Sequence, residues 1–103
     1  MEEFNFKKEP AIEKGNTYSV CLRGARRLDT VKIMPLKFNG VLIGQSQVSR
    51  CKQFRFTDIS EFDCLDNYDP SARTFEDLKN AMYNGYEEFD TSEIVTLVYF
   101  TVL

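Results

Sequence analysis

Apolar and polar residues alternate in short runs along the first half of this chain. Phe4–Lys7 alternates as an opening strand does, and Tyr18–Leu22 forms a second run with β-type side chains. Val31–Leu36 predicts a third strand, in which Pro35 requires an edge or a bulge because proline has no amide hydrogen for a strand ladder. This half of the chain therefore predicts mainly β-structure.

An Asn-Gly pair gives the clearest local signal. Asn39 and Gly40 stand between apolar runs, and this pair is typical of a tight hairpin in which both turn residues take a positive φ. The returning strand is predicted to be long, from Val41 to about Phe56. Gly44 and the polar residues after it predict a bend or bulge, as in a curling sheet.

Two helices are predicted. Pro10 suits the first turn of a short helix over Ala11–Lys14, which the following glycine would close. A second helix begins at Thr74, whose spacing to Asp77 has the form of a capping box, and it ends at Gly85.

The remaining stretches complete an α+β pattern. Residues 57–73 are acidic and lack the spacing of a calcium loop, so we expect a solvated, irregular loop there. Ile94–Leu103 is almost continuously hydrophobic and predicts a central strand. A bending sheet with two helices at its ends predicts a small mixed β-barrel, closed or half-closed, and residues 1–103 are expected to form a single domain.

Composition excludes several kinds of chemistry. The chain has no histidine, which excludes Ser-His-Asp and Cys-His catalysis and an ordinary zinc site, and no metal or cofactor is expected. The cysteines, Cys21, Cys51 and Cys64, form no CxxC motif. No apolar run is long enough to span a membrane, and the acidic N-terminus lacks a signal-peptide core, so the expected compartment is the cytoplasm and no membrane partner is expected.

The net charge of −3 conceals a division between the halves of the chain. Residues 1–56 contain eleven Lys and Arg against five Asp and Glu, whereas residues 57–103 contain two against eleven. This asymmetry is typical of a protein with one surface for nucleic acid, but it equally fits two halves that pair electrostatically in the fold. Both interpretations stay open at this point.

The densest positive charge lies in Gly15–Arg27. A β-type run there leads into three arginines within five residues, and guanidinium groups suit phosphate and carboxylate. The cluster is either a solvated loop or part of a ligand-binding surface. On the second hypothesis the binding residues are a tyrosine that stacks a base and five cations from two segments: Tyr18, Arg23, Arg26, Arg27, Arg50 and Lys52.

Several segments together resemble the ASCH domain, a member of the PUA-like β-barrel superfamily. The resemblance covers nearly the whole chain and rests on five short segments: a predicted helix ending at Lys14-Gly15, a strand that runs into Arg23, Phe54–Ile59, Phe75–Leu78 and Ile94–Phe100.

The resemblance implies a fold and a class of function. It implies a PUA-like barrel with a cleft between barrel and helices that takes RNA or a nucleoside-sized ligand. Some members of the family are amidohydrolases that act on N4-acetylcytidine, and some have been linked to RNA cleavage. The primary hypothesis is therefore binding of RNA or a nucleotide-like ligand in a basic cleft.

The chain departs from the catalytic signature of the family. That signature is a Gly-x-Lys segment that leads through a threonine to an arginine, with a carboxylate near the second helix. Here Gly15 is in place, but Thr17 stands at the lysine position and Val20 near the threonine position, and Arg23 comes one residue late. The nearest acid to the carboxylate position is Asp69. A threonine hydroxyl without an adjacent base does not change protonation near neutral pH, which weakens the catalytic reading.

Two alternatives to ligand binding remain. One is a small amidohydrolase for N4-acetylcytidine-like substrates that uses Lys14, Thr17 and Asp69. The other is an inhibitor or adaptor of the kind found in phage and mobile elements, whose acidic residues 57–93 would face a basic protein partner.

Overall fold

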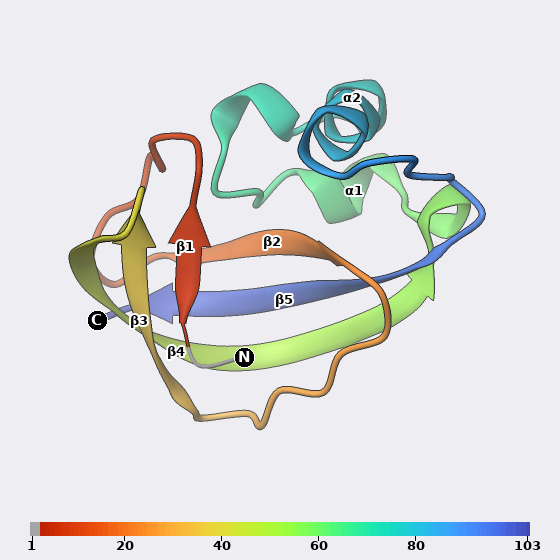
Figure 1. Cartoon of the computed structure of the whole chain (residues 1–103). Coiled ribbons are helices and arrows are strands. Elements are labelled where there is room, and N and C mark those ends of the chain that lie inside the picture. Colours follow the sequence, from red (N-terminus) through yellow and green to blue (C-terminus); the bar gives the residue numbers. More distant parts are fainter. Residues whose placement is uncertain (1–2) are drawn as a thin grey trace.

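The chain folds around one curled, mixed β-sheet. The computed structural model describes residues 3–103, and the five strands have the order β1-β3-β4-β5-β2 in the sheet (Figure 1). Only β1 and β3 are parallel to each other; the other neighbouring pairs are antiparallel. The strands are β1 (Phe4–Phe6), β2 (Thr17–Arg23), β3 (Ile33–Phe38), β4 (Val41–Arg55) and β5 (Ile94–Val102).

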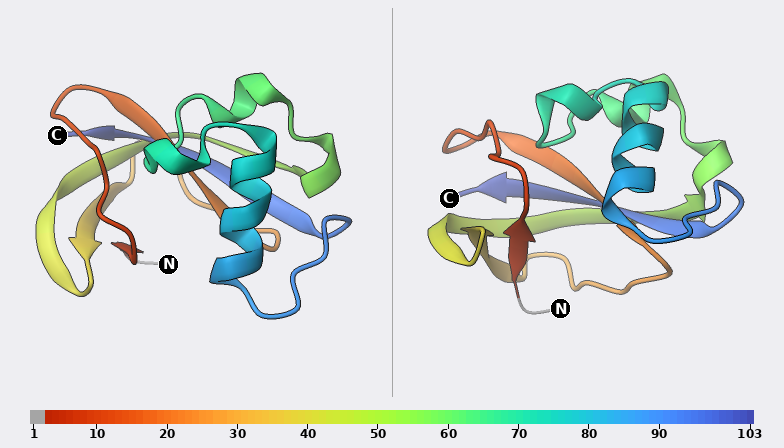
Figure 2. Two further views of the ribbon diagram at one scale, coloured as in Figure 1. Left: turned by 90° about the horizontal axis from the view of Figure 1, so that it is seen from above. Right: turned by 45° about the horizontal axis from the view of Figure 1, so that its top comes forward.

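The long strand β4 produces the curl. Its first part pairs with β3 and its second part with β5, so the sheet bends along this strand (Figure 2). The register shifts opposite Leu36 and Lys37, beside Gly44, and again between Val48 and Arg50. Extra residues at such bulges bend the strand and increase its twist. The predicted bend near Gly44 is confirmed.

The hairpin between β3 and β4 has the predicted form. Phe38 pairs with Val41, and the two residues between them have φ values of 48° and 80°, as a type I′ turn requires. Pro35 lies within β3 beyond the three residues that pair with β1, so its missing amide hydrogen breaks no ladder on that side.

The helices differ in part from the prediction. Helix α2 (Phe75–Gly85) has Thr74 as its N-cap, and the Thr74 side chain accepts a hydrogen bond from the amide of Asp77, which is one of the two hydrogen bonds of the predicted capping box. The other helix lies in the stretch expected to be irregular: α1 (Glu61–Cys64) has a complete capping box of Ser60 and Asp63, and short 3-10 turns precede and follow it.

The helix predicted over Ala11–Lys14 is wrong. Residues 10–13 have no regular secondary structure, and their amide hydrogens are used elsewhere: Ala11 donates to the carbonyl of Tyr68, and Glu13 donates to the hydroxyl of Tyr18. A helix of four residues forms too few internal hydrogen bonds to offset the free-energy cost of helix nucleation. The hydrogen bonds to Tyr68 and Tyr18 therefore determine the conformation.

Each face of the sheet buries its own hydrophobic cluster. Alternate residues of β2 and β5, such as Val20 and Phe100, pack with β1 and β3 inside the curl. The intervening residues, such as Leu97 and Tyr99, pack against α2 and the helical segments before it together with Phe56, which is completely buried. The result is the predicted α+β fold, a small mixed half-barrel with two flanking helices. Within residues 3–103, no helix has the length and apolar character needed to cross a membrane.

Candidate functional site

A cleft opens where the curled sheet fails to close. The strands β1 and β2 are the two edges of the sheet and do not pair with each other. The space between them continues toward α2 and has a volume of about 400 Å³. Ligand sites in proteins have volumes of this order, about 300–1,000 Å³.

Three parts of the fold line this cleft. Phe4 and Phe6 of β1 face Val20 and Leu22 of β2, and α2 contributes Leu78, Ala81, Met82 and Asn84. The segment before α2 adds Asn67, Tyr68 and Asp69, and Tyr86 follows the end of α2. The ring of Tyr68 stacks on that of Phe6 with 4.3 Å between centroids. The wall is therefore mainly apolar and aromatic, with amide, phenol and carboxylate groups at separate points.

Charged side chains stand at one side of the cleft. Lys7 and Lys8 line it directly after β1, and the side chain of Lys8 is 63% exposed. The ammonium group of Lys8 lies 3.8 Å from the carboxylate of Asp69. That carboxylate is buried and also accepts hydrogen bonds from the amide and hydroxyl of Ser71, at 2.9 and 2.7 Å. Asp69 thus caps the turn Pro70–Ala72 as well as lining the cleft.

Two groups in the cleft are held in their neutral forms. Burial, with smaller effects of Asp69 and Tyr86, raises the pKa of Tyr68 to about 12. Burial and the nearby thiol of Cys64 raise the pKa of Cys21 to about 12. The phenol can therefore donate a hydrogen bond at neutral pH, whereas the thiol is not a ready nucleophile, since the thiolate is the reactive form. Within residues 3–103, no three His, Cys, Asp or Glu side chains gather as a metal ion would require.

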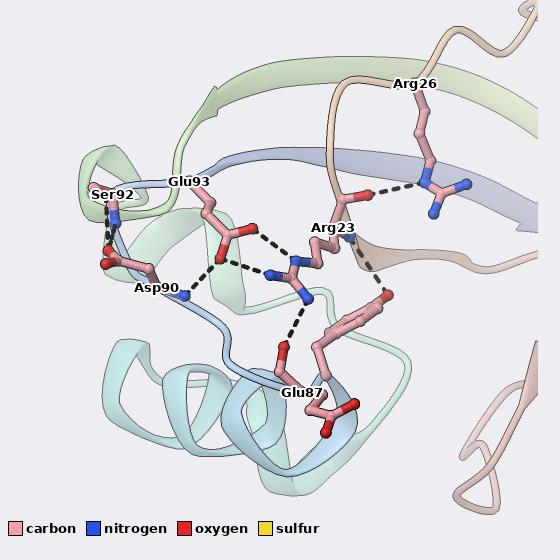
Figure 3. A network of polar contacts seen from close by, with 7 residues as sticks. Arg23, Arg26, Glu87, Asp90, Ser92 and Glu93 are labelled. Carbon is pink, nitrogen blue, oxygen red and sulfur yellow. Dashed lines mark hydrogen bonds and ion pairs between the residues drawn. The ribbon is translucent and has the colours of Figure 1, made fainter.

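Arg23, from the predicted arginine cluster, is used within the fold. Its Nε and Nη2 donate to the two carboxylate oxygens of Glu93 at 2.7 and 3.0 Å, and its Nη1 donates to the carbonyl of Glu87 at 2.8 Å (Figure 3). The amide of Asp90 donates to the same carboxylate. The hydrogen bond raises the pKa of Arg23 and lowers that of Glu93. This network, the Arg23 clamp, fastens the segment between α2 and β5 to the end of β2.

Arg26 and Arg27 lie on a loop that crosses the other side of the sheet. The amide of Arg26 donates to the hydroxyl of Thr96, and its carbonyl accepts from the side chain of Gln53. Farther along, Leu28 packs against the cluster inside the curl. The guanidinium of Arg26 donates to the carbonyl of Arg23, and Arg27 is exposed.

The two later cations lie on the helix-covered face. The guanidinium of Arg50 stacks over the ring of Tyr99, 4.4 Å from its centroid. Lys52 forms an ion pair with Asp63 of α1 at 3.3 Å. Burial raises the pKa of Asp63, but hydrogen bonds from Ser60 and from Lys52 outweigh it, so the net shift is downward. The structure therefore does not gather the five predicted cations on one concave surface, and none of them lines the cleft.

The remaining predicted residues are also dispersed. Tyr18 is buried against Phe100, and its hydroxyl accepts from Glu13 at the rim of a second, more open hollow. Lys14 and Thr17 are exposed and line neither space, and the hydroxyl of Thr17 lies 2.8 Å from that of Thr101. Of the three residues considered for hydrolysis, only Asp69 lines the cleft.

The residues that do line the cleft were not singled out from the sequence. Tyr68 stood within a stretch expected to be a solvated loop, and Tyr86 followed the predicted helix end. One signal was available: Asn67-Tyr68 and Asn84-Gly85-Tyr86 each place an amide near a tyrosine, on either side of α2. That signal is too short to indicate a site unless the fold, which brings the two segments to one cleft, is known.

Comparison with known proteins supports the fold. No protein-family model matches this sequence, and no curated protein matches it. Among solved structures, the chain is similar to the crystal structure of an ASCH domain from Lactobacillus crispatus JV V101, with a TM-score of 0.67 and 14% sequence identity. The match covers 85% of this chain, which spans 65% of the length of the other. The chain thus has the fold of an ASCH domain, as the resemblance in its sequence predicted.

Proposed function

We propose that this protein binds a nucleotide-sized ligand, either free or as an unpaired nucleotide of RNA, in the cleft between β1, β2 and α2. The observation that carries the proposal is the cleft itself, about 400 Å³ of mainly apolar and aromatic surface at the gap in the half-barrel. A base needs apolar walls for its faces, and a ribose needs a few polar partners.

The charges near the cleft fit a phosphate. Lys7 and Lys8 are exposed at the side of the cleft, and the 3.8 Å ion pair leaves most of the Lys8 side chain open to solvent. A phosphate placed there would meet two ammonium groups, which bind phosphate as point charges. This differs from the basic surface predicted around Arg23–Arg27, where Arg23 already pairs with Glu93.

Hydrolysis has less support than binding. Lys14 and Thr17 lie away from the cleft, and Asp69 is engaged by Ser71 and Lys8. The raised pKa of Cys21 and that of Tyr68 leave both groups protonated at neutral pH. A binding site needs no activated nucleophile, so these features fit ligand binding.

Calorimetric titration tests the proposal. Uridine, uridine 5′-monophosphate and a short single-stranded RNA serve as probes, and we expect the monophosphate to bind more tightly than the nucleoside. Lys8→Ala should weaken binding of the monophosphate about fivefold and leave uridine unchanged, because one exposed charge contributes up to about 1 kcal/mol. Lys14→Ala is the matched control, since Lys14 is exposed but does not line the cleft.

The outcomes distinguish binding in the cleft from nonspecific attraction to positive charge elsewhere on the chain. Equal losses in the two lysine variants would show that phosphate binding is diffuse and would contradict the proposal. Absence of binding by all three probes at low salt would remove it altogether.

A further inference from the structure

The outer edge of β2 is occupied at Ser19 and at Arg23 and open between these two residues. In β2, the amide and carbonyl of alternate residues point away from β5, and Ser19 shows which residues these are. Its amide donates to the carbonyl of Asp66 at 2.7 Å, and its carbonyl accepts from the amide of Tyr68 at 2.9 Å. Ser19 therefore turns both backbone groups outward, and a short parallel bridge to Asn67 covers them.

Arg23 marks the other end of this edge. Its amide donates to the hydroxyl of Tyr86 at 3.4 Å, and its carbonyl accepts from the guanidinium of Arg26 at 3.1 Å. The pairing of β2 with β5 runs from Thr17 to Arg23 without a register shift, so the alternation is unbroken. Cys21, midway between Ser19 and Arg23, must also turn its amide and carbonyl outward.

These two groups of Cys21 face the cleft without a protein partner. Within residues 3–103, no hydrogen bond to the outward amide or carbonyl of Cys21 is formed. The residue is only 7% exposed, and it lines the cleft together with Val20 and Leu22. Buried backbone groups are nearly always paired, so an unpaired donor and acceptor at a cleft wall indicate a ligand position.

We infer that the Cys21 peptide groups recognise the hydrogen-bonding edge of a nucleobase, an inference that rests on the proposed function. One residue of an extended strand presents its N–H and C=O side by side and roughly parallel. The Watson–Crick edge of a base offers the complementary pair, an adjacent acceptor and donor; in uracil these are a ring carbonyl and N3–H.

The surroundings favour a flat ring over a peptide strand. A ring bonded to Cys21 continues the plane of the sheet. One face of the ring then lies toward the side chains of Val20 and Leu22, and the other lies toward Leu78 and Met82 of α2. An added peptide strand needs a series of alternate free backbone groups, but between Ser19 and Arg23 the edge of β2 offers those of Cys21 alone, because Ser19 and Arg23 are already bonded.

Nucleoside analogues test the inference without changing the protein. Uridine, 3-methyluridine and 5-methyluridine are titrated into the ¹⁵N-labelled chain, and affinity and amide hydrogen exchange are measured. The N3 methyl group removes the donor and blocks the edge, so we expect about tenfold weaker binding or more, whereas 5-methyluridine, with a methyl group of equal size, should bind within about threefold of uridine. Exchange of the Cys21 amide should slow when uridine binds.

The result that would overturn the inference differs from the one that would overturn the proposed function. If uridine binds, but 3-methyluridine binds equally well or the Cys21 amide is unaffected, the edge contact is absent while the cleft remains a binding site. If neither uridine nor its 5′-monophosphate binds, the proposed function fails and the inference fails with it.

Discussion

The two edge strands of the β-sheet, β1 and β2, differ in how the positive charges at their ends are paired. Where β2 ends, the guanidinium of Arg23 donates hydrogen bonds to the carboxylate of Glu93 and to the carbonyl of Glu87. Where β1 ends, Lys7 and Lys8 stay exposed beside a cleft of about 400 Å³. In the denser cluster, Arg23 therefore serves the fold, whereas the sparser pair of lysines lies beside the cleft that we propose as a binding site. Charge indicates a binding site best when it lies beside a concave surface and its side chain stays open to solvent, as that of Lys8 does despite its 3.8 Å ion pair with Asp69.

The largest expected effect in this comparison is on stability. Arg23→Ala should lower the thermal unfolding midpoint clearly, because it leaves the Glu93 carboxylate and the Glu87 carbonyl without their shared donor. Arg27→Ala, at an exposed position, should change the free energy of unfolding by less than about 0.5 kcal/mol. Thermal melts of the two variants by circular dichroism check this, and equal midpoints would mean that the clamp contributes nothing.

The clamp also predicts how stability depends on pH. The pKa of Glu93 is lower in the folded chain than the usual glutamate value of about 4.3, so its contribution is present above that value and is lost as the pH falls through the folded pKa. The difference in midpoint between the wild type and Glu93→Gln should therefore be large at pH 7 and shrink below about pH 4. Melts across this range measure it, and a difference that stays constant with pH would exclude the ion pair as its cause.

The smallest expected effect concerns the two remaining arginines of the cluster. Arg26→Ala and Arg27→Ala should change affinity for uridine 5′-monophosphate by less than about twofold, because a loop on the far side of the sheet holds both residues outside the cleft. Calorimetry on each variant checks this. A loss larger than that of Lys8→Ala would return the binding surface to the arginine cluster.

The fold was more predictable than the site because its signals are local. The Asn39-Gly40 turn, the cap at Thr74 and the continuous apolar run of β5 each depend on neighbours in sequence, and the structure confirms all three. There were two exceptions. In residues 10–13, hydrogen bonds to Tyr68 and Tyr18 override a weak helical tendency, and helix α1 lies in the stretch expected to be irregular.

The site depends on contacts between distant segments. The cleft joins residues near position 6, position 21, position 68 and position 86, and no local pattern relates them. Arg23 pairs with Glu93, which lies seventy positions away in the sequence, so the sequence alone does not show that the charge of Arg23 is already paired. The backbone groups of Cys21 stand out as free only because those of Ser19 and Arg23 are hydrogen-bonded to distant segments. The types of side chain along β2 do not indicate those bonds.

One pair of substitutions tests most directly whether the cleft is the binding site. Asn84 and Asn80 are both exposed on α2, but only Asn84 lines the cleft. A tryptophan at position 84 should fill part of the space, so Asn84→Trp should weaken binding of uridine 5′-monophosphate by at least about tenfold, while Asn80→Trp should leave it unchanged. Equal affinities for the two variants, with both folded by circular dichroism, would contradict a ligand site in this cleft.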